Sequence, residues 1–139
     1  MLQPCTSVYR VIKTGVYLVQ PYTEGPVAST AFGEPTLIEP EDFRSKIADA
    51  VFANLDKFGK EKYDRSRAIR LSPGEQRQFL KQHLGVSVQK LESGGLGIYA
   101  LHREGGGMVG SDEDTIELSE SASPQELADA IAEAFKRAT

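Results

Sequence analysis

The stretch GGGMVGSDEDTIELSES, residues 105–121, holds the most obvious candidates for chemistry in this sequence. It places four glycines ahead of five carboxylates, without a lysine or an arginine. A phosphate-binding loop of the Walker type needs a lysine directly after its last glycine, because the lysine neutralises the phosphate. A dinucleotide-binding loop needs a helix after its glycines, whereas the pattern here predicts a strand. The stretch is therefore not a phosphate-binding loop.

Metal binding and catalysis find little more support. A calcium-binding EF-hand loop needs alternating acids, a central glycine and a glutamate at its last position, and DEDTIELSESAS lacks that glycine. His83 falls near the expected end of a helix, a position where histidine is commonly structural. His102 follows the strand-like GIYAL and could act as a general acid or base, but no Ser, Cys or Asp forms a recognisable set with it. We expect no catalytic residue, no metal ion and no cofactor, and hence no enzyme.

The remaining feature of this part of the sequence is its negative charge. Nine acidic residues and no basic one lie between Glu104 and Phe135. Such a run is often only a solvated face, but it also suits electrostatic recognition of a basic partner such as a nuclease, whose cleft must be positive. On charge, the candidate contact residues are Glu104, Asp112, Glu113, Asp114, Glu117 and Glu120. Tyr99 and Met108 are candidate apolar anchors beside them.

A basic stretch, residues 57–70, balances this acidic third with six basic and two acidic side chains. It contains Tyr63 and could suit a phosphate-bearing ligand, although surface loops are often rich in Lys and Arg. The net charge of −4 and the pI near 5.2 disfavour direct binding of nucleic acid. We therefore expect a protein partner, with no nucleic acid, membrane or small-molecule substrate.

Composition indicates one soluble domain over residues 1–139, with residues 1–7 as a loose N-terminal extension. The single cysteine, Cys5, excludes an intrachain disulfide framework and is typical of a reducing cytosol. No apolar run approaches the roughly 18 residues of a membrane span, and the N-terminus does not resemble a secretory signal. We expect a cytoplasmic protein.

The elements that must position these residues follow from periodicity and turn signals. Residues 7–23 predict a β-hairpin turning at Thr14-Gly15, residues 24–36 a loop, and TLIEP a short extended piece. A first helix is expected from Pro40 to Phe58, ended by Gly59, because its apolar residues recur at helical spacing.

Two further helices begin with the same capping motif, SPGE at Ser72 and SPQE at Ser123. The first is expected to run through His83 to Gly85 and the second to the C-terminus. Residues 86–92, 96–104 and 115–120 predict strands, and the first two should meet across Ser93-Gly94-Gly95. The fold class is α+β, a mostly antiparallel sheet of about five strands with about three helices, in the order β-β-α-α-β-β-β-α. Alternation places Glu117 on the face opposite Ile116 and Leu118.

The segments FRSKIADAVFANL, EQRQFLKQHLGVSV and DTIELSESASPQELADAIAEAF resemble those of the immunity proteins of bacterial contact-dependent growth inhibition systems. The similarity spans Val8 to Ala138 and departs from the family pattern at Asp129, where a glycine is typical. It implies a non-enzymatic cytosolic protein that binds one cognate toxin C-terminal domain, one to one, and occludes its active site or substrate path. Such toxins are often nucleases that cut transfer RNA.

Two other classes fit the sequence. A small acidic secretion chaperone would dimerise and hold an extended client segment. A small metal-dependent hydrolase would use His102 with the neighbouring acids.

Overall fold

The computed structural model describes residues 2–139 and has the predicted α+β architecture. Its strands are β1 (Cys5–Val11), β2 (Tyr17–Glu24), β3 (Ser29–Ala31), β4 (Thr36–Ile38), β5 (His83–Lys90), β6 (Leu96–Glu104) and β7 (Gly107–Leu118). Its α-helices are α1 (Phe43–Lys57), α2 (Pro73–Gln82) and α3 (Pro124–Arg137), and two 3-10 turns are η1 (Pro40–Asp42) and η2 (Arg65–Arg67). None of the helices in residues 2–139 combines the length and apolarity needed to cross a bilayer.

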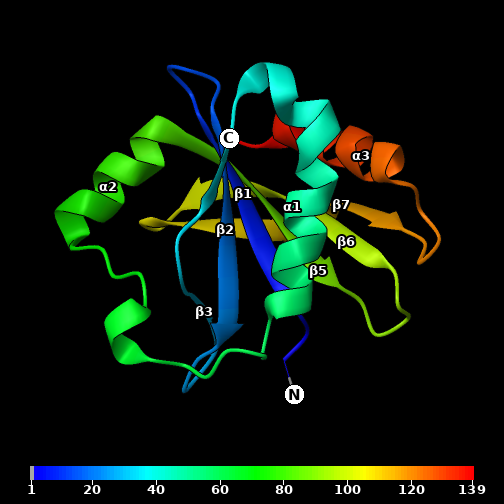
Figure 1. Ribbon diagram of the computed structural model, residues 1–139. Coiled ribbons are helices and arrows are strands. Elements are labelled where there is room, and N and C mark those ends of the chain that lie inside the picture. The colour runs from blue at the N-terminus through cyan, green and yellow to red at the C-terminus, as the bar shows by residue number, and fades with distance from the viewer. Residues whose placement is uncertain (1) are drawn as a thin grey trace.

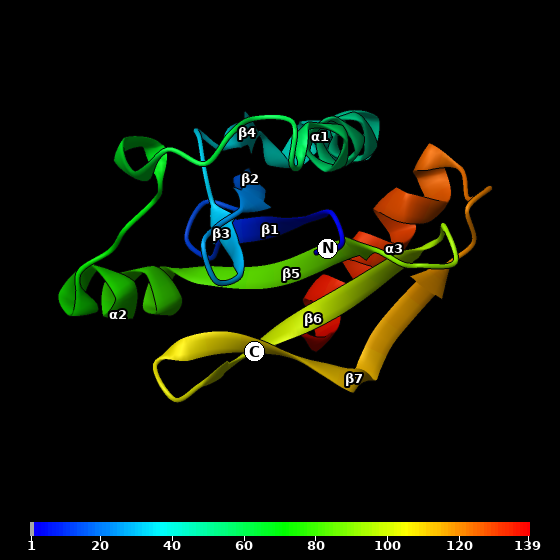
Figure 2. The same cartoon turned by 90° about the horizontal axis from the view of Figure 1, so that it is seen from below.

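All strand pairs are antiparallel, and the sheet order is β3-β2-β1-β5-β6-β7, with β4 also paired to β2. The sheet is strongly twisted (Figure 1). Figure 2 shows α1 and α3 on one side of the sheet, toward the right of the view, while α2 lies apart from them at the left. Helix α1 packs over β1 and β2, and α3 packs over β6 and β7. One face of the sheet is thus covered by two helices.

The core lies between that face and the two helices. Side chains alternate along a strand, so every second residue of the central strands points into the core. Val8, Val19, Val86, Val88 and Ile98 meet Ile47 and Val51 of α1 and Leu127 and Ile131 of α3, and all nine are fully buried. Burying each such side chain contributes roughly 1.5–3 kcal/mol to folding.

One buried polar group ties α1 to the sheet. The amide of Asn54 donates to the Thr6 hydroxyl oxygen at 3.1 Å and to the Val19 carbonyl oxygen at 3.4 Å. Thr6 in turn donates to the Gln20 carbonyl at 2.8 Å. Because each of these buried groups has a partner, they avoid the penalty of desolvation and fix the position of the helix.

The hairpin at residues 7–23 and the capping motifs are confirmed. Gly15 has φ +78°, in the left-handed region that a tight turn here requires. Ser72 accepts from the amide of Glu75 and Ser123 from that of Glu126, and both glutamates bond back to the cap amides.

Four predicted boundaries are wrong. Residues 83–85 belong to β5, because their backbone pairs with β1 and this overrides the helical pattern. Residues 29–31 form β3 instead of loop, and residues 5–7 form part of β1 instead of a loose extension, with Thr6 fully buried. Strand β7 begins at Gly107, so the acids at 112–114 lie in a strand and not in a loop. With β3 and β4 added, the sheet has seven strands.

Candidate functional site

The face of the sheet turned away from α1 and α3, here called the open face, carries a row of polar side chains. Strand register aligns Gln20, Ser7, Ser87, Tyr99 and Thr115 across β2, β1, β5, β6 and β7. Side chains that alternate with core residues normally point to solvent on such a sheet. Here part of the face is enclosed instead, because α2 packs against β5 and β7 and the segment before it bonds to Ala31 of β3.

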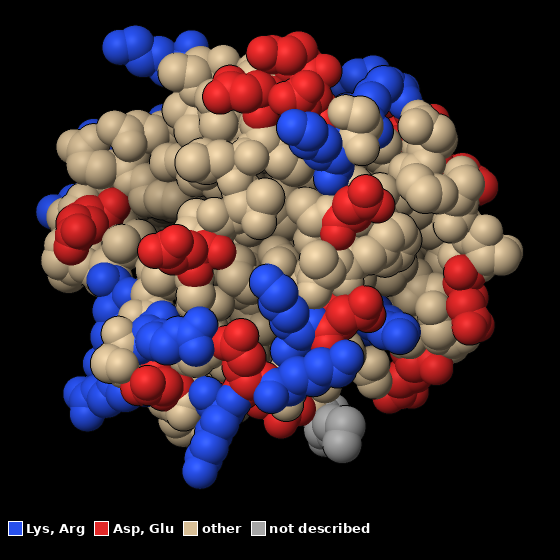
Figure 3. Space-filling model, in the orientation of Figure 1, with Lys and Arg blue, Asp and Glu red and all other residues tan. Residues whose placement is uncertain are grey.

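This enclosure forms a hollow of about 610 Å³. Figure 3 shows the surface indented between α2 and the strands in front of it. Its lining is entirely uncharged: Cys5, Ser7, Tyr9, Leu18, Gln20, Tyr22, Ala31, Pro35, Ile69, Leu71, Gln76, Phe79, Leu80, Ser87, Leu101 and Met108. An apolar concavity of a few hundred Å³ with some convergent polar groups is the usual shape of a binding site.

Hydroxyl groups form the floor of the hollow. Ser7 Oγ donates to the Tyr22 hydroxyl at 3.3 Å, and the Tyr9 and Tyr22 hydroxyls lie 3.3 Å apart. Burial raises the pKa of Tyr9, and the neighbouring Tyr22 raises it further. Burial likewise raises the pKa of Cys5, partly offset by a hydrogen bond with Ser29. These groups stay neutral at physiological pH, so the floor offers hydrogen bonds and no charge.

The wall made by α2 is joined to the sheet by aromatic contacts. Phe79 meets the ring of Tyr9 edge-on at 4.8 Å and stacks on His83 at 4.0 Å. His83 is buried, and its Nδ1 lies 2.8 Å from the Phe79 carbonyl oxygen. His83 therefore joins the end of α2 to β5 and has a structural role.

Both predicted anchors lie on the open face. Met108 lines the hollow and packs over Gly85, where an added Cβ would come within 2.9 Å of its sulfur. Tyr99 lies over Gly97, where an added Cβ would come within 2.7 Å of the phenol oxygen. The glycines of these strands thus make room for the two side chains that could contact a partner.

The six predicted acids do not form one patch. The pairing of β6 with β7 shifts between Tyr99–Thr115 and Leu101–Gly110, so residues 111–114 bulge out. Asp112 and Glu113 are exposed on this bulge, and Glu117 is exposed opposite Gly97 on the open face, as alternation predicted. Glu104 ends β6, and Glu120 lies against Gly94. A bulge re-aims side chains in a way that strand alternation cannot foresee.

Asp114 points elsewhere, toward His102. The His102 Nε2 atom lies 2.7 Å from Asp114 Oδ2, and its Nδ1 lies 2.8 Å from Thr139 Oγ. Thr139 also exchanges backbone hydrogen bonds with Leu101 and Arg103. The expectation that no Asp accompanies His102 is therefore wrong. Both ring nitrogens thus have a hydrogen-bond partner. The imidazole thereby connects the bulge of β7 to Thr139, which follows α3.

No group of three or more His, Cys, Asp or Glu side chains within residues 2–139 is arranged to hold a metal ion. The residue that departs from the family pattern, Asp129, forms an ion pair with Arg44, which also donates to Gln125 at 3.0 Å. Asp129 thus links α3 to α1 on the surface.

Neither a protein-family model nor a curated protein sequence matches this chain. Two solved structures are similar to it over nearly their whole lengths. A protein of unknown function from Neisseria meningitidis superposes with a TM-score of 0.71 at 16% identity, covering 99% of this chain and 96% of the other. A chain of the CdiA-CT/CdiI toxin and immunity complex from Yersinia pseudotuberculosis superposes with a TM-score of 0.71 at 14% identity, covering 100% and 99%. At these identities the similarity establishes a shared fold.

Proposed function

We propose that this chain is an immunity protein that binds a cognate toxin in the cytoplasm and neutralises it without catalysis. The fold supports this proposal, because it matches a chain of a toxin and immunity complex over its whole length. The resemblance of three sequence segments to such immunity proteins leads to the same expectation. The cognate toxin is proposed to be a basic nuclease, bound one to one, because a nuclease cleft must be positive and this chain carries a long acidic third.

The open face supports this function best as the docking surface, and the observation that carries it is the uncharged hollow. Ile69 and Leu71 at its border leave 44% and 42% of their surfaces exposed, although both are large apolar side chains. A partner side chain that enters the hollow would cover them together with Met108. Tight protein interfaces concentrate their binding free energy in such desolvated pockets.

The exposed acids complement this anchor. Glu117 shares the open face with Tyr99, and Asp112 and Glu113 project from the bulge beside it. Charges at the border of an interface chiefly accelerate encounter and exclude wrong partners. We propose that they steer a basic toxin toward the hollow, and that the bound immunity protein blocks the active site or substrate path.

Co-expression with the toxin fragment encoded immediately upstream tests the proposal. We expect the fragment alone to stop growth, and its coexpression with this chain to restore growth and to yield a one-to-one complex. Titration of toxin activity should end at one equivalent, as stoichiometric inhibition requires. A fragment without toxicity, or toxicity that this chain leaves unchanged, would refute the immunity function.

A matched pair of variants tests the docking surface separately. Leu71→Asp places a charge at the border of the hollow and should weaken the complex by about tenfold or more. Val27→Asp makes the same change at a side chain that is 95% exposed and outside the hollow, and it should leave affinity unchanged. Equal affinities in the two variants, with growth rescue intact, would retain the immunity function and reject the hollow as its docking site.

A further inference from the structure

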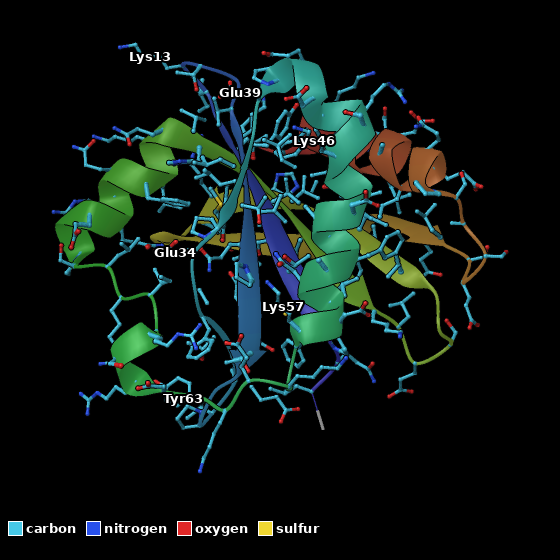
Figure 4. All side chains as sticks on the ribbon, in the orientation of Figure 1. Lys13, Glu34, Glu39, Lys46, Lys57 and Tyr63 are labelled. Carbon is cyan, nitrogen blue, oxygen red and sulfur yellow. The ribbon has the colours of Figure 1, made fainter. Side chains whose placement is uncertain are left out.

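A second surface lies on the segment that leads from α1 toward α2, and it reaches the border of the hollow only near its end, at Ile69. The basic segment, residues 57–70, carries Lys57, Lys60, Lys62, Arg65, Arg67 and Arg70, all exposed. Figure 3 shows Lys and Arg side chains gathered at the bottom of the view, and Figure 4 places Lys57 and Tyr63 in that region. Within residues 2–139, only Arg67 of these six has a carboxylate partner, Glu61 at 3.0 Å. Five of the six cations therefore form no ion pair, although Glu61 and Asp64 lie in the same segment.

The segment is nevertheless firmly attached to the sheet. The Thr23 hydroxyl donates to the Glu61 carbonyl at 3.1 Å, and the Ile69 amide donates to the Ala31 carbonyl at 3.1 Å. Asp64 caps η2 by accepting from the Ser66 amide at 3.0 Å and from its hydroxyl at 2.8 Å. The cations are thus presented on an ordered scaffold.

One partly exposed aromatic ring, that of Tyr63, lies among the cations, while Phe32 beneath it is buried. The Arg67 guanidinium lies 4.6 Å from the centroid of Phe32, and the half-buried Tyr63 ring lies 6.3 Å from the same ring. Cations beside an accessible aromatic ring suit single-stranded nucleic acid, because phosphates meet Lys and Arg while a base stacks on the ring.

We infer that the basic segment binds single-stranded nucleic acid, with Lys60, Lys62, Arg65 and Arg70 facing phosphates and Tyr63 offering a stacking surface. The net charge of −4 masks this strip, because most of the excess acid lies in residues 104–135. The inference therefore reverses the expectation from net charge. It does not depend on the immunity function.

The test is fluorescence anisotropy of labelled 15-nucleotide oligouridine and oligoadenine with the full chain. Four cations that face phosphates predict an affinity that falls by about 50-fold between 50 and 200 mM salt. Lys62→Glu/Arg65→Glu should weaken binding strongly and flatten that salt dependence. Tyr63→Leu should weaken it by about fivefold or more at unchanged salt dependence, because stacking is not ionic.

Lys13→Glu/Lys46→Glu is the matched control, since it changes net charge equally at residues that Figure 4 shows at the opposite end from Tyr63. It should bind like the wild type. Three outcomes would overturn the inference: no binding of either oligonucleotide at 50 mM salt, equal losses in the two double variants, or binding to anionic phosphatidylserine vesicles or a poly-glutamate peptide in preference to the oligonucleotides. A thermal melt of each variant should show a cooperative transition, as expected of a folded protein.

Discussion

The Tyr9 side chain both packs against an aromatic ring and takes part in a hydrogen-bond network. Its ring packs against Phe79 at the wall of the hollow, while its hydroxyl meets that of Tyr22 on the floor. Removal from water disfavours the phenolate, so burial raises the pKa of Tyr9 above the ordinary value of 10.0. The folded state therefore favours the protonated phenol of Tyr9.

This gives a pH dependence with a definite sign. Above pH 10 the unfolded chain releases the Tyr9 proton and the folded chain retains it, so stability falls as pH rises, by up to about 1.4 kcal/mol per pH unit. The raised pKa of Cys5 adds a loss of the same sign that begins near pH 9. Urea unfolding between pH 7 and 11 should show this decline, and Tyr9→Phe should make it shallower. Tyr63→Phe, outside the hollow, is the matched control; an equal slope in Tyr9→Phe and the wild type would contradict the assignment.

At the scale of elements, the two capped helices share a motif but differ in how they couple to the fold. Helix α3 buries six side chains, whereas α2 buries only Leu80. Capping satisfies the same amide groups in both helices. The consequence of losing a cap should therefore depend on packing.

Ser123→Ala should lower the free energy of unfolding of the whole protein by about 1 kcal/mol, because α3 is part of the core. Ser72→Ala should lower the stability of α2 by a similar amount but leave the global unfolding midpoint nearly unchanged. Amide hydrogen exchange in α2 should accelerate in Ser72→Ala while the core strands keep their protection. Equal shifts of the midpoint in both variants would contradict this division.

The elements that could be predicted from the sequence are those that depend on residues close together in the chain. The capping boxes and the β5–β6 hairpin depend on residues close together in the chain, so local patterns predict them. The start of β5 at His83 depends on pairing with β1, which lies some seventy residues away and overrides a helical pattern. The proximity of Asp114 and His102 depends on the β7 bulge, and the hollow depends on how α2 returns over the sheet. No local pattern carries such information.

Over the whole molecule, charge is segregated while net charge is modest. The acids of residues 104–135 follow the second half of the sheet and α3, and the basic segment lies beyond the end of α1. The two surfaces attract partners of opposite charge, and the uncharged hollow lies between them, lined by Ile69 of the basic segment and by Met108 of β7. Association with a basic toxin should then depend on salt through the exposed acids and on shape through the hollow.

The exposed acids can be tested without disturbing the fold. Asp112→Asn/Glu113→Gln leaves Asp114 and its hydrogen bond with His102 intact. Since both side chains are exposed, we expect toxin association in stopped flow to slow by roughly tenfold at low salt and to depend less on salt, with dissociation nearly unchanged.

Glu41→Gln/Asp49→Asn removes the same charge from η1 and the exposed side of α1, and it should retain most of the wild-type rate. Equal slowing in the two variants would mean that total charge steers the toxin, and unchanged kinetics in the first would exclude the bulge of β7 from the interface.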